Sequence, residues 1–206
     1  MASQQLQYSN MDKCYWQEKI TWNVIKNFFD SKFGEGTTAT DVSVDIKQIA
    51  IWTHGACEVE LNWFTPNTHP EIVGKQKKPD FSISVNGTDV AAIESKNHNV
   101  RDLWSMARFK DQVLTRFQSY AKTLPKILVI GKFLPAKSDG AAIEKLLKDQ
   151  HIRVIETGRQ ATSSADVESS KAIKSQLEPI LRAIVWRVRV WNWKRKITQL
   201  LGRDYD

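Results

Sequence analysis

The stretch KKPDFSISVNGTDVAAIESKN, residues 77–97, restricts the fold more than any other part of the chain. Two short apolar runs flank an Asn-Gly pair, and this combination is a strong signal for a β-hairpin. Charged side chains stand at the open end of that hairpin, with Asp80 on one arm and Glu94 and Lys96 on the other. The sequence therefore predicts a hairpin that can bring two carboxylates and an amine together.

The pairing register decides whether these three side chains share a face. A two-residue Asn-Gly loop would pair Val85 with Thr88 and turn Glu94 away from Asp80, because one residue of offset reverses a side chain. A turn one residue longer would place Asp80, Glu94 and Lys96 on one face, and a bulge inside either strand would have the same effect.

Hydrophobic patterning supports the shifted register, because that register separates an apolar face from a polar one. The apolar face would be formed by Phe81, Ile83, Val85, Ala91 and Ile93. Val90 is the apolar side chain that this register leaves on the polar face. We therefore expect a three-residue loop or a bulge.

The remaining apolar patterns predict alternating helices and strands. Helices are expected at 12–33, 101–124 and 141–150. The segment 171–201 favours a helix that Pro179 interrupts or restarts, although WRVRV within it alternates like a strand. Further strands are expected at 43–52, 57–63, 126–132 and 152–158, with loops at 64–79 and 159–170. This order predicts an α/β domain with a mixed central sheet covered by helices on both faces.

Length and composition are those of a globular protein that can bury a real core, with 41% hydrophobic and 26% charged residues among 206. The longest apolar runs are far too short for a membrane span, and the first residues lack the apolar core of a signal peptide. Cys14 and Cys57 form neither a disulfide framework nor a zinc motif. We therefore expect a cytoplasmic protein without membrane contact.

The net charge of +7 suggests an anionic partner. Residues 171–206 contain nine basic and three acidic residues and so carry +6 of this charge. We expect a core over residues 1–160, followed by a linker and a basic, aromatic extension over 161–206.

Two carboxylates within reach of one point form a hard oxygen site, which suits Mg²⁺ or Mn²⁺ holding a phosphate. Such a metal can polarise a phosphoryl oxygen and lower the pKa of an attacking water. Lys96 would lie on the same face as Glu94, where its charge can position that water or offset developing negative charge. The bland alternative is an exposed cross-strand charge cluster.

The pattern of Pro79-Asp80 followed by Glu94-Ser95-Lys96 resembles the PD-(D/E)XK nuclease superfamily, which includes many restriction enzymes and Holliday-junction resolvases. The expected order of elements from about residue 12 to 132 is similar too. The resemblance implies a restriction-endonuclease-like core and Mg²⁺ as cofactor, with Mn²⁺ able to substitute. It also implies that Asp80 and Glu94 ligate the metal, that the Ser95 carbonyl adds a ligand, and that Lys96 assists the water.

Families of this kind often use a glutamate on the first helix, and Glu18 is the candidate here. Many carry a glutamine on the helix after the lysine; Gln112 and Gln118 both qualify, and the sequence does not separate them. Lys78 lies beside the proposed site and could contact phosphate. Members that cut both strands commonly act as dimers, so the resemblance implies a homodimer.

The segment RVRVWNWKRK interleaves cations with tryptophans. The cations would bind phosphates without regard to sequence, and the tryptophans could stack on exposed bases. Alternatively, Trp186, Trp191 and Trp193 complete the core of a docking helix. The expected nucleic-acid contacts are Arg187, Arg189, Lys194, Arg195 and Lys196.

These observations favour a metal-dependent endodeoxyribonuclease that acts on double-stranded DNA. An RNA endonuclease with a similar core is an alternative, although His54 is a poor counterpart for the metal-binding histidine of viral cap-snatching enzymes. A noncatalytic DNA-binding module on the same scaffold is another. A structural or adaptor protein, with hairpin charges that serve only solubility, is a third.

Overall fold

The computed structural model describes residues 2–66, 71 and 74–200. Within them, a seven-stranded sheet has the order β1-β2-β3-β4-β5-β7-β9, and β6 pairs separately with β8. The strands are β1 (Thr37–Thr40), β2 (Ile46–His54), β3 (Cys57–Phe64), β4 (Phe81–Val85), β5 (Thr88–Lys96), β6 (Leu103–Trp104), β7 (Lys126–Ile130), β8 (Leu134–Pro135) and β9 (Ile152–Glu156). The helices are α1 (Ala2–Phe33), α2 (Met106–Gln112), the 3₁₀ helix η1 (Leu114–Phe117), α3 (Gly140–Asp149) and α4 (Val167–Leu200).

The large sheet is mixed. Strands β1 to β5 each pair antiparallel with the next strand along the chain, whereas β5, β7 and β9 pair parallel. Parallel neighbours need long crossover connections, and the segments that contain α2 and α3 provide them. The α/β class and the mixed central sheet expected from the sequence are confirmed.

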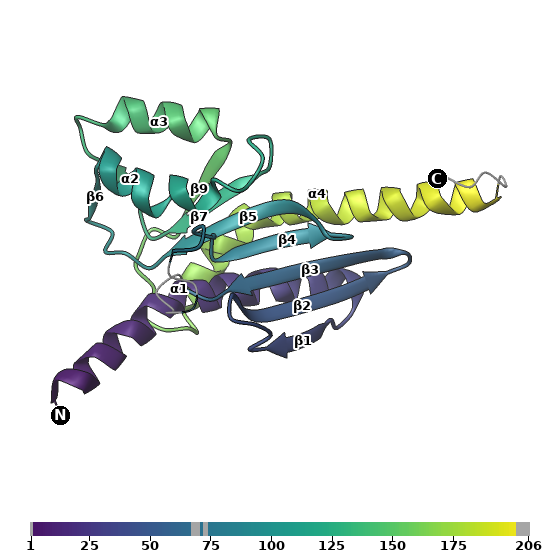
Figure 1. The fold of residues 1–206 in the computed structure, drawn as a ribbon, viewed down its shortest axis with the longest axis horizontal. Helices are drawn as coiled ribbons and strands as arrows, with labels where there is room; N and C mark the ends of the chain where they lie inside the picture. Colours follow the sequence, from purple (N-terminus) through teal and green to yellow (C-terminus); the bar gives the residue numbers. More distant parts are fainter. Residues whose placement is uncertain (1, 67–70, 72–73, 201–206) are drawn as a thin grey trace.

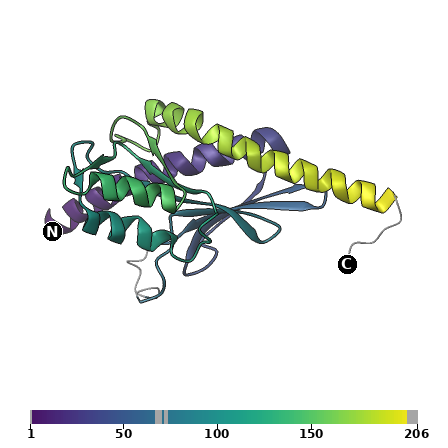
Figure 2. The same ribbon diagram turned by 90° about the horizontal axis from the view of Figure 1, so that it is seen from above.

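Helices lie on both sides of the sheet (Figures 1 and 2). On one face, α1 and α4 pack over most strands and form the larger core, to which Phe29 and Leu181 contribute. On the other face, α2, η1 and α3 cover the parallel strands through Phe109, Phe117 and Ile143. Strand β5 therefore runs between two buried layers.

The helix expected over 101–124 is wrong in extent, because the chain forms β6, α2 and η1 there. Trp104 is fully buried and pairs with Pro135 in the small sheet, which keeps the start of the segment extended. Ser105 caps α2 by accepting a hydrogen bond from the N–H of Arg108 at 3.3 Å. Val113 has φ −123° and ψ −61°, outside the helical range, and thus ends α2.

The helices at the two ends of the chain are longer than expected. α1 reaches back to Ala2, and α4 begins at Val167 and continues through Pro179 without a break. The last turns of α4 extend past the end of the sheet (Figure 1). None of the helices within the described residues combines the length and apolar character that crossing a lipid bilayer requires.

Candidate active site

The turn of the β4–β5 hairpin has two residues. Asn86 and Gly87 have φ angles of 50° and 74°, as a type I′ turn requires, and Val85 pairs with Thr88. The three-residue loop expected from the sequence is therefore wrong. Asn86 also accepts a hydrogen bond from the N–H of Glu58 at 2.8 Å through its side-chain oxygen, which ties the turn to β3.

A bulge in β5 corrects the register, which confirms the alternative that the sequence left open. Ser84 pairs with Asp89 but Ile83 pairs with Ala91, so Val90 has no partner in the ladder. Val90 packs against the larger core and does not stay on the polar face. One extra residue in β5 therefore restores the parity that a two-residue turn would have lost.

The shifted register places Asp80 and Glu94 together at the open end of the hairpin. The N–H of Asp80 donates to Glu94 Oε2 at 3.2 Å, and the N–H of Ser95 donates to Asp80 Oδ2 at 2.6 Å. Glu94 is fully buried and Asp80 is half-buried. Each carboxylate is thus held by a backbone donor from the opposite arm.

Burial of these two carboxylates disfavours their charged forms. It raises the pKa of Glu94 to about 7, with the nearby charge of Asp80 acting in the same direction. Burial also raises the pKa of Asp80, although the Lys96 ammonium, the Ser95 N–H and the Arg116 guanidinium oppose it. At neutral pH and without a bound cation, ionisation of both carboxylates therefore costs free energy.

Two cations face Glu94. Lys96 Nζ forms an ion pair with Glu94 Oε1, and Arg116 Nε lies 3.7 Å from the same oxygen. Burial alone would lower the pKa of Lys96, but the Glu94 and Asp80 carboxylates outweigh it and raise that pKa above its ordinary value. Lys96 is therefore protonated at neutral pH.

Arg116 was not expected at this site from the sequence. It lies in η1, and its Nη1 also donates to the backbone carbonyl of Lys78 at 3.4 Å, so it joins the segment before β4 to Glu94. Its position in RFQSYAK, the stretch that also contains Gln118, was the available signal. Only the break between α2 and η1 determines which side chain of this stretch faces the hairpin.

Helix α1 brings a third carboxylate to the cluster. Glu18 Oε2 accepts a hydrogen bond from Trp63 Nε1 at 3.0 Å. Burial, followed by the charge of Asp80, raises the pKa of Glu18 well above its ordinary value, and Lys96 partly compensates. The charges of Asp80 and Lys96 thus act on Glu18, while its role in catalysis stays a prediction.

The side chain of Ser95 points toward α1, where its Oγ lies 3.3 Å from Thr21 Oγ1. Its N–H holds Asp80. A metal-ligating role for the Ser95 carbonyl stays a prediction.

The two glutamines differ in position. Gln112, the last residue of α2, lies with its Oε1 3.1 Å from His98 Nε2, and His98 packs edge-on against Trp104. Burial and the charge of Arg108 lower the pKa of His98. Gln118 is exposed beyond η1. Gln112 is therefore held by His98, two residues after Lys96, and Gln118 lies on the surface.

Lys78 is close to the cluster through its backbone only. Its Nζ forms an ion pair with Asp45 at 2.7 Å and lies 4.7 Å from the centre of the Phe64 ring. The ammonium is partly exposed, and its contact with a phosphate stays a prediction.

The donor set fits a hard divalent cation in its chemistry. Glu94 Oε1 is buried without a hydrogen bond of good geometry, and so is Arg116 Nε opposite it. Carboxylate oxygens are the ligands that Mg²⁺ and Mn²⁺ prefer. Within the described part of the chain, however, no group of three or more His, Cys, Asp and Glu side chains is arranged to hold a metal ion.

The basic side chains expected to bind nucleic acid lie far from this cluster. All five are exposed on the second half of α4, and three of them, Arg187, Lys194 and Arg195, line hollows next to the hairpin turns. Thr88 and Glu94 are six positions apart in β5, so the turn and the cluster are separated by about 20 Å. The five are Arg187, Arg189, Lys194, Arg195 and Lys196.

The tryptophans of α4 do not complete the core. Trp186, Trp191 and Trp193 are 67%, 50% and 64% exposed. The core contacts of the helix come instead from aliphatic side chains such as Leu181 and Val188.

Comparison of the chain with models of protein families, with curated proteins and with solved structures finds no match in any of the three. The arrangement of the residues themselves therefore carries the functional argument.

Proposed function

We propose that this protein is a metal-dependent nuclease that hydrolyses phosphodiester bonds in DNA. The observation that carries the proposal is the bulge at Val90, which places Asp80 and Glu94 within mutual contact and Lys96 beside them. The bulge leaves Val90 without a pairing partner in the sheet, and it brings together charged side chains whose burial costs free energy. Bulges that re-aim side chains in this way are common next to active sites.

Asp80 and Glu94 would hold the cation, with Glu18 as a further carboxylate nearby. When bound, Mg²⁺ would supply a Lewis acid for the phosphoryl oxygen and lower the pKa of a water molecule. Its two charges would also favour ionised Glu94, which burial now disfavours. Raised pKa values in a cluster of carboxylates are common at functional sites, and this supports the proposal.

Lys96 and Arg116 would act on the phosphate. Both are held against Glu94 Oε1 in the structure and both carry positive charge in a largely buried place. A phosphodiester gains negative charge on its nonbridging oxygens during attack, and a positioned ammonium or guanidinium stabilises that charge. Lys96 can also orient the attacking water by donating a hydrogen bond to it.

A noncatalytic DNA-binding module is the second candidate. The ion pair between Lys96 and Glu94 favours it, because a lysine that neutralises a buried carboxylate leaves no need for a metal. This candidate predicts DNA binding that EDTA does not change and no cleavage in any metal.

The test is cleavage of circular and linear DNA in Mg²⁺, Mn²⁺ and EDTA, with RNA in parallel. Asp80→Ala and Lys96→Ala should lower cleavage at least about a hundredfold while folding and DNA binding persist. Asp111→Ala is the matched control, because Asp111 is an exposed acid paired with Lys77. Calorimetric titration with Mn²⁺ gives a readout independent of activity, and Asp80→Ala should lose the binding. Cleavage absent from the wild type in every metal would overturn the proposal.

A further inference from the structure

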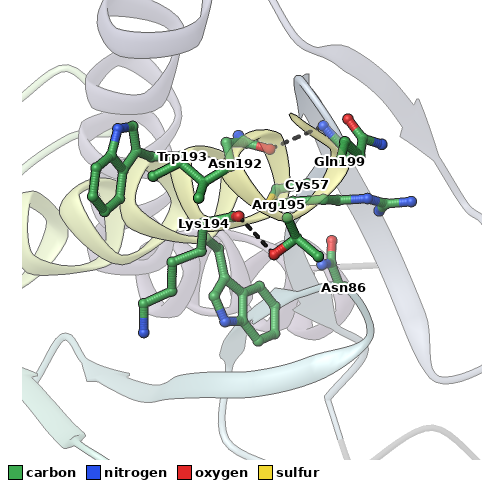
Figure 3. A pocket seen from close by; sticks show the side chains of 11 residues that line it. Cys57, Asn86, Asn192, Trp193, Lys194, Arg195 and Gln199 are labelled. Atoms are coloured by element: carbon green, nitrogen blue, oxygen red, sulfur yellow. Dashed lines mark hydrogen bonds between the residues drawn. The ribbon is translucent and has the colours of Figure 1, made fainter. Parts of the chain in front are cut away.

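Two hollows flank Trp191 where α4 passes the hairpin turns. The larger, about 890 Å³, is lined by residues of both turns and by the end of the helix, including Asn86, Trp191, Lys194 and Arg195 (Figure 3). The smaller, about 310 Å³, lies between α4 and the start of β5 and is lined by Trp186, Arg187 and Trp191 among others. Trp191 forms a wall of both. We call Trp186, Arg187, Trp191, Lys194 and Arg195 the α4 platform.

The α4 platform combines exposed indoles with cations and lacks acids. The sequence from Pro179 to Arg203 contains no Asp or Glu, so this part of the helix carries no acidic side chain that could neutralise these charges. Figure 3 shows Lys194 and Arg195 reaching from the helix on different sides of the larger hollow. Such a surface attracts a polyanion that also offers flat apolar groups.

The platform is rigidly attached to the sheet. Asn192 Oδ1 accepts a hydrogen bond from the N–H of Ala56 at 3.0 Å, and Asn192 Nδ2 donates to the carbonyl of His54. Gly55 lies between them, where an added Cβ would come within 2.8 Å of Asn192 Oδ1. The helix is therefore fixed on the β2–β3 turn, and a ligand would meet a preformed surface at a low entropic cost.

The charge pattern selects among possible occupants. A second copy would bring like charges together, which costs free energy. In a duplex the base faces are stacked on one another, so the indoles around Trp191 could not reach them. An unpaired strand offers phosphates to Arg187, Lys194 and Arg195 and free base faces to Trp186 and Trp191.

We propose that the α4 platform binds unpaired nucleotides, and that the substrate is therefore DNA with a single-stranded segment. The substrate assignment rests on the proposed nuclease function, whereas strand binding does not. The platform lies about 20 Å from Glu94, at the other end of β5. A strand held there can continue along the hairpin to the acidic cluster, so the platform selects the substrate and the cluster cuts it.

Binding is measured by fluorescence anisotropy in EDTA, so that no cleavage occurs, with a labelled oligothymidine and with its duplex with oligoadenine. The wild type should bind the single strand at least about tenfold more tightly and show quenched tryptophan fluorescence. Trp191→Ala should weaken single-strand binding about tenfold or more, and Trp191→Phe, which keeps a stacking face, should retain most of it. Trp191 is half exposed, so both variants should fold.

The salt dependence tests the cations separately. Each phosphate contact contributes about 0.7 to the slope of log K against log salt for a single strand, so Lys194→Ala with Arg195→Ala should lower it by about 1.4. Arg182→Ala is the matched control, since Arg182 is an exposed cation of the same helix that pairs with Glu178 outside both hollows.

Each outcome decides between the two proposals. Tighter binding of the duplex, or equal single-strand binding by the wild type and Trp191→Ala, would overturn the proposal that the α4 platform binds unpaired nucleotides. Binding only to anionic lipid vesicles, with no oligonucleotide bound, would also overturn it and indicate a membrane surface instead. Single-strand binding by the platform without any cleavage would overturn the proposed nuclease function and would leave the α4 platform as a strand-binding surface.

Discussion

The carboxylates of Asp80 and Glu94 are each fixed by a backbone N–H from the opposite arm of one hairpin. The N–H of Asp80 donates to Glu94 Oε2 at 3.2 Å, while the N–H of Ser95, next to Glu94, donates to Asp80 Oδ2 at 2.6 Å. These bonds fix two carboxylates that repel each other, and the ammonium of Lys96 offsets part of the repulsion.

Deletion of Val90 should abolish metal binding and cleavage. Without the bulge residue, a two-residue turn would place Glu94 and Lys96 on the face opposite Asp80. Val90→Ala keeps the residue count and loses only part of a half-buried side chain, so it should cost about 1 kcal/mol of stability and retain activity. Manganese titration and DNA cleavage check both variants. Normal Mn²⁺ affinity after the deletion would show that the register does not build the site.

The free energy of unfolding should fall as the pH rises from about 4.5 to about 7 in EDTA. The pKa of Glu94 is about 7 in the folded protein and about 4.5 in the unfolded chain, so the folded state binds more protons in this range. The loss is on the order of 3 kcal/mol. The raised pKa values of Glu18 and Asp80 act in the same direction.

Urea denaturation at several pH values measures this slope. The Glu94→Gln side chain cannot ionise, so this variant should show a weaker dependence of the unfolding free energy on pH. The dependence that remains would come from Glu18. Saturating Mn²⁺ should flatten it too, because the cation favours the ionised carboxylates. A wild-type stability that rises across this pH range would contradict the assignment.

Replacement of Arg116 by Gln should move the pH profile of cleavage to higher pH. The guanidinium lies 3.7 Å from Glu94 Oε1 and favours its ionised form, so its loss raises the pKa of Glu94 further. The activity loss should be greater at pH ~6 than at pH ~8. Lys110→Gln, an exposed cation on α2, is the control and should leave the profile unchanged. An equal loss at both pH values would mean that Arg116 acts on the substrate alone.

Trp63→Phe should lower stability by about 1–3 kcal/mol, because Glu18 loses the indole N–H that satisfies its buried carboxylate. It should also weaken Mn²⁺ binding, since Glu18 is then free to turn. Trp52→Phe is the matched control: Trp52 Nε1 donates to Asp30 Oδ1 at 2.9 Å, far along the sheet from the cluster. Both variants should be destabilised in thermal unfolding, and only Trp63→Phe should change the titration. An unchanged Mn²⁺ affinity in Trp63→Phe would exclude Glu18 from the site.

Local sequence patterns were sufficient for the hairpin and for most elements. Asn86-Gly87 and the alternation around it predicted the two strands, because turn chemistry and side-chain period are properties of neighbouring residues. The need to bring Asp80, Glu94 and Lys96 to one face predicted an extra residue. Whether that residue lay in the loop or in β5 was open, since both restore the same parity.

The sequence by itself determined the hairpin, the mixed α/β sheet and the identity of the acids and the lysine that could form a site. The tertiary structure alone decided that Val90 bulges, that the segment before Val113 breaks off as a short helix, and that Arg116 faces Glu94. It also decided that Trp191 stays exposed at the opposite end of the sheet from the acids. The physical reason is that periodicity records only which side of an element is buried, whereas contacts between residues distant in the chain depend on how the packed layers meet.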